Sequence, residues 1–261
     1  MQAEQLQALK NWFNQYVKNF YHDDPNVQAG IRLKEEHTQR VCEKILRIGS
    51  SLNLGPEDLY LAETIALLHD IGRFKQFVLY HTFNDRRSEN HALLGIRELE
   101  RTGVLAALTE EERNLVTRSI EYHNLCTLPP DLPERLSLFA RLIRDADKLD
   151  ILEMFTASLD RKNDKPEAQQ ISGLPDTPGY SPVLVRNLLQ GQLCHYNDMK
   201  NSNDHKLLML SWIYDINFPY SLSEIASNGC VEKIVARLPK TEEVQKVYEH
   251  LQAYMARRLA R

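Results

Sequence analysis

The sequence predicts an all-α protein, a helical bundle with additional helices toward the C-terminus. Glycine and proline are scarce, at 10 and 11 of 261 residues, and dipeptides that favour β-hairpin turns are few. Leu, Glu, Gln and Arg, which favour helices, are abundant. Apolar residues also recur every three or four positions, which is the period of a helix that buries one face.

The first part of the chain is expected to contain six helices. Asp23-Asp24-Pro25 ends the first, and Pro56 suits the first position of the third. Thr109 and Glu112 form a capping box before the fifth. The third helix is apolar almost all round near its end, which is typical of a central, buried helix. The six helices cover residues 3–21, 27–52, 56–70, 88–102, 109–123 and 134–159.

Residues 72–88 are expected to form a loop with at most one short helical turn. We interpret four aromatic residues in this loop as packing residues, with one of them a candidate for stacking on a base: Phe74, Phe77, Tyr80 and Phe83. Ser88 then caps the helix that ends near Thr102, and Gly103 stands where a terminating glycine is expected.

A proline-rich segment over residues 161–182 is the best linker candidate. It separates a helical core, residues 1–160, from a C-terminal helical extension, residues 161–261. The helices of the extension are expected near residues 182–194, 203–214, 222–237 and 241–259. Their apolar faces are too wide to be buried within one helical hairpin. We therefore expect the extension to pack on the core, so that the chain forms one continuous domain.

The composition excludes several function classes. The formal net charge is −4 and acidic and basic residues are interspersed, so no general nucleic-acid-binding surface is indicated. No segment approaches the roughly 18 consecutive apolar residues of a membrane span, and the N-terminal residues do not resemble a signal peptide. The four cysteines are far apart, which is typical of reduced core residues in a cytoplasmic protein. The sequence carries no signal for an oligomeric state.

Four histidines and two aspartates form an ordered series along the expected helices: His37, His69-Asp70, His91, His123 and Asp147. The interval from His37 to His69 is 32 residues, and the interval from His91 to His123 is the same. Each interval fits a helix, a turn and a returning helix. Each hairpin therefore brings its two histidines back to the same level.

His69-Asp70 follows an apolar run over residues 65–68, so the pair is expected at the end of a buried helix. Burying an imidazole and a carboxylate without partners costs several kcal/mol. A metal cation is an efficient partner for both. The other His-Asp pair, His22-Asp23, lies at a helix end without an apolar wall and is expected to be exposed.

The donor set predicts one or two divalent transition-metal ions. His37, His69, Asp70 and Asp147 are expected to hold one ion, and His91 and His123 a second, with Asp70 as the bridge. Imidazole and carboxylate ligands suit Mn, Fe, Co, Ni or Zn, with Mg as a further candidate. Two such ions about 3.5–4 Å apart would clamp a phosphate and generate hydroxide from bound water.

Five segments of the chain resemble the HD-domain superfamily of metal-dependent phosphohydrolases, in order and with suitable spacing. They are HTQRV, ALLHDIGRF, ENHALLGIREL, EYHN and IRDADKLD, and the resemblance covers about residues 30–155. It implies an all-α bundle in which His37, His69, Asp70 and Asp147 bind a divalent metal. Members that also have the two further histidines, here His91 and His123, often bind two.

The resemblance also implies cleavage of a phosphate ester or anhydride in a small phosphorylated substrate, with a nucleotide as the favoured class. Metal-activated water or hydroxide would be the nucleophile. Asp70 is expected to orient the metal and the attacking water, while Arg73 and Lys148 are expected to contact phosphate and supply positive charge. Asp145 lies on another helical face and is interpreted as a group behind the ligands or as a solvated residue.

At two positions this chain differs from particular branches of the superfamily, which makes those branches less suitable as its assignment. Some single-metal nucleotidases have Glu three residues after the Asp of the His-Asp pair, where this chain has Arg73. The cyclic di-GMP phosphodiesterases have two adjacent histidines where this chain has His123-Asn124. Two alternatives use the same ligand set or fold: a mixed-valent di-iron oxygenase, and a catalytically silent regulatory HD module.

Overall fold

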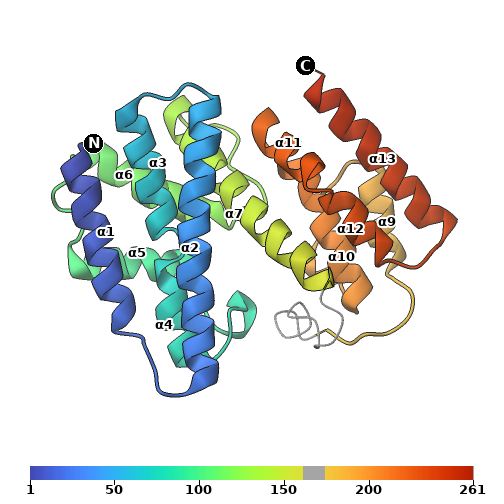
Figure 1. Ribbon diagram of the computed structural model, residues 1–261, viewed down its shortest axis with the longest axis horizontal. Helices are drawn as coiled ribbons and strands as arrows, with labels where there is room; N and C mark the ends of the chain where they lie inside the picture. The colour runs from blue at the N-terminus through green and yellow to red at the C-terminus, as the bar shows by residue number, and fades with distance from the viewer. Residues whose placement is uncertain (161–173, 261) are drawn as a thin grey trace. The chain divides into compact units, whose positions relative to one another are not determined.

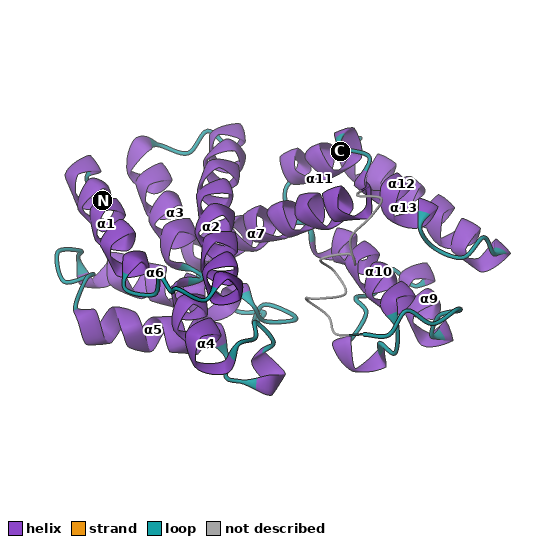
Figure 2. Cartoon of the chain, turned by 60° about the horizontal axis from the view of Figure 1, so that its bottom comes forward, coloured by secondary structure: helices purple, strands orange, loops and turns teal. Residues whose placement is uncertain are grey.

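The computed structural model describes residues 1–160 and 174–260, and Figure 1 shows how their helices are arranged. Within those ranges the chain forms helices joined by loops and turns, with no strand (Figure 2). The prediction of an all-α fold is confirmed. The chain divides into two compact units, Met1–Asp147 and Lys148–Arg261.

The first unit contains six helices and the beginning of a seventh, in or beside the expected ranges. Asp24 caps α2 by accepting a hydrogen bond from the backbone N–H of Asn26, and the capping box of Thr109 and Glu112 begins α6. The helices are α1 (Ala3–Lys18), α2 (Pro25–Ser51), α3 (Pro56–Leu68), α4 (Ile71–Tyr80), α5 (His91–Thr102), α6 (Glu110–His123) and α7 (Glu134–Asp160).

Helix α3 is the centre of the first unit, as its apolar sequence predicts. It packs against α1, α2 and α6, and its residues from Ile65 to Leu68 are buried. In Figure 1, α3 lies between α1 and α2. Burial on several sides places the end of α3, and therefore His69 and Asp70, inside the bundle.

The expectation of a loop over residues 72–88 is wrong for its first half, because residues 71–80 form α4. Ile71 and Phe74 are fully buried, and Phe74 contacts Phe13 of α1 edge to face at a centroid distance of 5.9 Å. Gly72 does not break this helix but permits its close approach to α5. A Cβ atom at Gly72 would overlap the carbonyl oxygen of His91 and would lie 2.6 Å from the backbone nitrogen of Gly95.

The segment between α4 and α5 contains a short 3₁₀ helix, η1 (Asp85–Arg87). The N-cap of α5 is Asn90 rather than Ser88, because the Asn90 side chain accepts hydrogen bonds from the backbone N–H groups of Ala92 and Leu93. His91 is therefore the first residue of α5, as expected.

In its described residues, 148–160 and 174–260, the second unit contains the rest of α7, five further α-helices and two short 3₁₀ helices, η2 (Tyr196–Asp198) and η3 (Trp212–Asp215). The single helix expected over residues 222–237 is two helices, because Gly229 adopts a left-handed φ of 61° between them. The five are α9 (Pro182–Leu189), α10 (Ser202–Ser211), α11 (Pro219–Ser227), α12 (Cys230–Ala236) and α13 (Glu242–Leu259).

Helix α13 packs against α9, α11 and α12 within the second unit. Residues 161–173 of the expected linker lie outside the described residues. The boundary near residue 160, and the shared core of the extension with the preceding helices, stay predictions. Among the described helices, none has the length and apolar composition needed to cross a bilayer.

Candidate metal centre

Six side chains from separate parts of the first unit converge inside the bundle. His37 comes from the middle of α2, and His69 and Asp70 lie at the junction of α3 and α4. His91 begins α5 and His123 ends α6. Asp147 comes from α7 and its side chain is 20% exposed, whereas the other five side chains are buried.

The six residues form three overlapping groups with the geometry of metal ligands. Within each group, one nitrogen or oxygen atom of every member lies within 4.8 Å of the others. The groups are His37, His69 and Asp70; His69, His123 and Asp147; and Asp70, His91 and His123. The ordered series found in the sequence is thus a single cluster in space.

The two oxygen atoms of the Asp70 carboxylate face different histidines. Oδ2 lies 3.6 Å from Nε2 of both His37 and His69. Oδ1 lies 3.3 Å from Nε2 of His91 and 3.9 Å from Nε2 of His123. This division is the arrangement that a bridging carboxylate between two ions requires.

Asp147 approaches the cluster on the side of His37 and His69. Its Oδ1 lies 3.1 Å from Nε2 of His37 and 3.8 Å from Nε2 of His69. One carboxylate oxygen of Asp147 and one of Asp70 therefore face the same two imidazoles.

Hydrogen bonds at Nδ1 determine which nitrogen three of the imidazoles present to the cluster. Nδ1 of His69 lies 2.7 Å from the carbonyl oxygen of Ala66, and Nδ1 of His123 lies 2.6 Å from that of Ile120. Nδ1 of His91 lies 2.7 Å from Asp85 Oδ2. Carbonyl and carboxylate oxygens only accept hydrogen bonds, so each Nδ1 carries the hydrogen and each Nε2 has its lone pair free for a metal.

Burial keeps these imidazoles in the neutral form that binds metals. It lowers the pKa of His69 and His91, and together with the nearby His91 and His69 it lowers that of His123 to about 3. Burial raises the pKa of Asp70, but the positive charges of Lys34 and Arg73 oppose it, and the pKa of Asp70 lies well below its usual range. Neutral imidazoles around an ionised carboxylate are the ligand states that divalent metals require.

The residues fit a divalent ion by a second criterion. Nε2 of His69 is buried and has no hydrogen-bond partner among the described residues, although it faces two carboxylates. A buried nitrogen lone pair without a donor is costly, and a cation would satisfy it. Nitrogen and oxygen donors without sulfur suit several transition metals and select no single one.

Two charged side chains next to the cluster, Lys34 and Asp85, are not among the site residues predicted from the sequence. Nζ of Lys34 lies 2.7 Å from Oδ2 of Asp70, and Lys34 is one helical turn before His37 on α2. That spacing is a sequence signal that could have identified Lys34. Asp85 lies on η1, where no periodicity indicates which side chain faces the cluster.

Arg144 supports His123 from behind. It is buried and donates hydrogen bonds to the backbone carbonyl groups of Tyr122 and His123 at the C-terminal end of α6, and to those of Leu125 and Cys126 in the loop that follows. Its charge compensates the negative end of that helix. Arg144 and Asp147 are one turn apart on α7, so the same helix positions His123 and supplies the Asp147 carboxylate of the cluster.

The structure places Arg73 next to the cluster. Nε of Arg73 lies 3.5 Å from Oδ1 of Asp70, while Nη1 donates hydrogen bonds to Asp85 Oδ1 and the Phe83 carbonyl oxygen. Asp145 is fully buried, which rules out the solvated alternative for it. In the second unit, Nζ of Lys148 lies 2.7 Å from Asp215 Oδ2. Contact of Arg73 and Lys148 with phosphate stays a prediction.

The comparisons with known proteins agree with the resemblance read from the sequence. Residues 35–152 match the family described as HD domain, and this range contains all six residues of the cluster. No curated protein and no solved structure matches the chain. The HD domain family consists mostly of metal-dependent phosphohydrolases. Residues 35–152 therefore form an HD domain, and this part of the chain belongs to the HD-domain superfamily.

Proposed function

We propose that this protein is a metal-dependent phosphohydrolase that cleaves a phosphate ester or anhydride in a small molecule. The observation that carries the proposal is the cluster of four imidazoles and two carboxylates, whose ligand atoms form groups within 4.8 Å. A bound divalent ion would lower the pKa of a water molecule and polarise a phosphoryl oxygen. His37, His69, His91, His123, Asp70 and Asp147 would hold one or two such ions.

The protein's own cations supply the remaining positive charge in this proposal. Arg73 and Lys148 contact the phosphate, in line with the expectation from the sequence, and Lys34 adds a third cation beside Asp70. Arg73 and Lys148 already have carboxylate partners in Asp85 and Asp215. A phosphate would therefore either replace the carboxylate partner of each cation or bind the cation beside that carboxylate.

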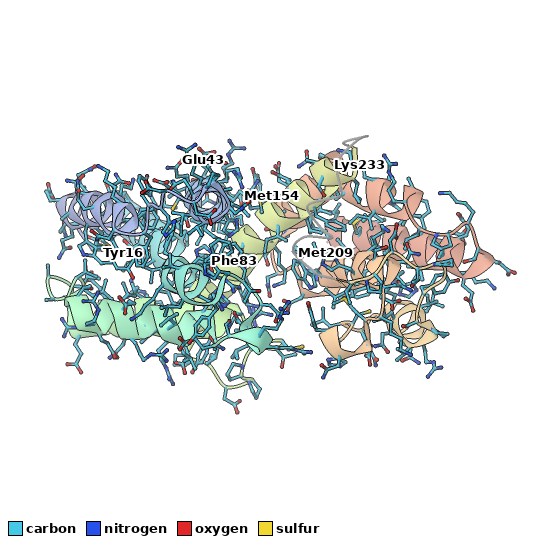
Figure 3. The ribbon with its side chains drawn as sticks, turned by 90° about the horizontal axis from the view of Figure 1, so that it is seen from below. Tyr16, Glu43, Phe83, Met154, Met209 and Lys233 are labelled. Carbon is cyan, nitrogen blue, oxygen red and sulfur yellow. The ribbon has the colours of Figure 1, made fainter. Side chains whose placement is uncertain are left out.

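We favour a nucleotide as the substrate class. Besides the resemblance to the superfamily, one aromatic side chain near the cluster supports this choice. Phe83, labelled in Figure 3, stacks on Phe77 at a centroid distance of 4.4 Å. Nζ of Lys34 lies 5.4 Å from the centre of the Phe83 ring and also contacts Asp70. A base stacked near Phe83 would place its phosphates toward the cationic side of the cluster.

We place the enzyme in the cytoplasm, in keeping with its four free cysteines.

The test combines metal analysis with a substrate screen. The purified protein is analysed for bound metal and then assayed with phosphomonoesters, phosphodiesters and nucleotides in the presence of Mn²⁺, Co²⁺, Ni²⁺, Mg²⁺ or Fe²⁺. We expect stoichiometric metal, and phosphate release that a chelator abolishes. A metal-loaded protein that turns over none of these substrates would contradict the phosphohydrolase proposal.

Two further outcomes would identify the alternatives. Failure to bind any metal would indicate a silent regulatory module. Two bound irons with oxygen consumption on a small organic substrate would indicate the di-iron oxygenase, whereas phosphate release under anaerobic conditions would count against it.

A further inference from the structure

We infer that Asp85 is a positioning residue for the metal centre, because it holds the His91 imidazole in the form whose Nε2 can bind a metal. The inference rests on the proposed metal binding and assigns a role to a residue of η1 that the ligand series does not include. It concerns one half of the cluster, the group of Asp70, His91 and His123.

The Asp85 carboxylate is held at both oxygen atoms. Oδ2 lies 2.7 Å from Nδ1 of His91. Oδ1 accepts hydrogen bonds from Arg73 Nη1 at 2.8 Å and from Gln76 Nε2 at 2.9 Å. Gln76 is fully buried, and its Nε2 also lies 2.8 Å from the Ser88 hydroxyl oxygen and 2.9 Å from the Glu89 carbonyl oxygen, so its two hydrogens are shared among three acceptors of the loop that contains Asp85.

The orientation of His91 depends on this one side chain. The Nδ1 hydrogen atoms of His69 and His123 are donated to backbone carbonyls one turn earlier in their own helices. His91 is the first residue of α5 and donates its Nδ1 hydrogen to the Asp85 side chain instead. Of these three histidines, His91 is the one whose Nδ1 partner is a side chain. Replacement of that one side chain can therefore change which ring nitrogen of His91 carries the hydrogen.

The hydrogen-bonding groups around Asp85 predict what an amide would do there. In Asp85→Asn, Arg73 and Gln76 still present two donors, so the amide oxygen must face them and the NH₂ group must face Nδ1 of His91. The NH₂ group donates to Nδ1, which moves the imidazole hydrogen to Nε2. The Nε2–H group then faces Nε2 of His123 at 3.0 Å and Asp70 Oδ1 at 3.3 Å, and it no longer offers a lone pair. Asn124 Nδ2 is 3.5 Å from both Asp85 Oδ2 and Nδ1 of His91, which is too far for a strong competing hydrogen bond to either atom.

The change of tautomer predicts an order of effects for the two variants that a loss of packing does not. Asn is nearly the same size and shape as Asp, so a structural role predicts that Asp85→Asn is mild and Asp85→Ala is worse. The positioning role predicts the reverse. Ala adds no donor, and a water molecule can replace the carboxylate at Nδ1, whereas Asn enforces the wrong tautomer.

The experiment compares wild type, Asp85→Asn, Asp85→Ala and the control Glu89→Gln. Glu89 belongs to the same loop, but its carboxylate contacts Arg97 and Tyr80. The first readout is the ring ¹⁵N NMR signals of His91 in metal-free protein, which report the tautomer. The second is a Co²⁺ titration followed by visible absorption. Thermal unfolding confirms that each variant is folded.

We expect the Nδ1–H tautomer in wild type and Glu89→Gln, and the Nε2–H tautomer in Asp85→Asn. Co²⁺ affinity should fall about 10–100-fold in Asp85→Asn, the usual effect of losing such a support, and less in Asp85→Ala. An unchanged tautomer in Asp85→Asn, or a larger loss of Co²⁺ affinity in Asp85→Ala than in Asp85→Asn, would overturn the inference. If wild type binds no Co²⁺, the proposed function fails, while the tautomer measurement still tests Asp85.

Discussion

Nε2 of His91 and Nε2 of His123 lie 3.0 Å apart, and the Nδ1 hydrogen of each ring is already donated to an oxygen. The two nitrogen lone pairs therefore face each other at hydrogen-bonding distance with no hydrogen atom between them. Such a pair is repulsive unless a cation is bound to it. Asp70 Oδ1 lies 3.3 Å from one of these nitrogens and 3.9 Å from the other, and it completes a set of three donors.

Replacement of Asp70 by Ala should abolish metal binding and activity together. Both carboxylate oxygens are lost, and with them the only anion that faces all four histidines of the cluster in the described part of the chain. Metal content by elemental analysis and phosphate release measure the two effects. Asp23→Ala, in the exposed His22-Asp23 pair, is the matched control and should change neither. Full metal occupancy in Asp70→Ala would contradict the assignment of the bridge.

Replacement of Arg73 by Ala should weaken substrate binding more than metal binding. Asp85 keeps its hydrogen bond from Gln76 in this variant, so the support of His91 is reduced but not reversed. We expect KM for the phosphate substrate to rise about 10–100-fold, because an Arg–phosphate contact is strong in a partly buried site. Metal content at saturating Mn²⁺ should stay close to that of wild type. Loss of the metal with an unchanged KM would show that Arg73 serves the ligands alone.

Replacement of Gly72 by Ala should destabilise the first unit by about 1–3 kcal/mol. The new methyl group would meet the backbone of His91 and Gly95, which cannot move aside as a flexible side chain can. Because His91 is displaced, metal affinity should fall as well. Urea unfolding measures the stability. Gly55→Ala is the control, since no atom lies within 4 Å of its added Cβ, and its effect should stay below about 1 kcal/mol.

The stability of the protein should depend on pH through Glu98. Burial raises the pKa of this carboxyl, but hydrogen bonds from Arg101 and Lys75 outweigh it and lower the pKa to about 2. A pKa lower in the folded state than in the unfolded chain stabilises the fold above the unfolded value of about 4.5, and this contribution disappears as the pH falls toward 2.

The contribution of Glu98 to the free energy of unfolding should be about 1–3 kcal/mol. It is limited because Lys75 and Arg101 are exposed to solvent, which screens their charges. Urea unfolding between pH 7 and pH 2.5 measures it. Glu98→Gln should remove this part of the pH dependence. If the variant and wild type lose stability in parallel across that interval, Glu98 is not the group responsible.

The sequence by itself determined the chemical composition of the candidate metal centre. Ligand strength depends on side-chain identity, and only His and Asp occur at the positions of the series. The equal intervals in the two histidine pairs predict helical hairpins whose ends meet, which the structure bears out for His37, His69, His91 and His123. The apolar run before His69 likewise predicts that this pair is buried, because an all-round apolar helix has no face to offer to water.

Only the tertiary structure decided how those ligands are held. Helix α4 was not predicted from the sequence. Its Gly72 has a low helix propensity, whereas in the fold the lack of a side chain permits contact with Gly95, 23 residues away in sequence. Asp85 reaches His91 through a loop conformation that depends on Gln76 and Arg73 of α4. The division of the Asp70 oxygens between two pairs of histidines depends on four helices at once. Periodicity reports only which face of one helix is buried, so contacts between elements become visible only when the chain is folded.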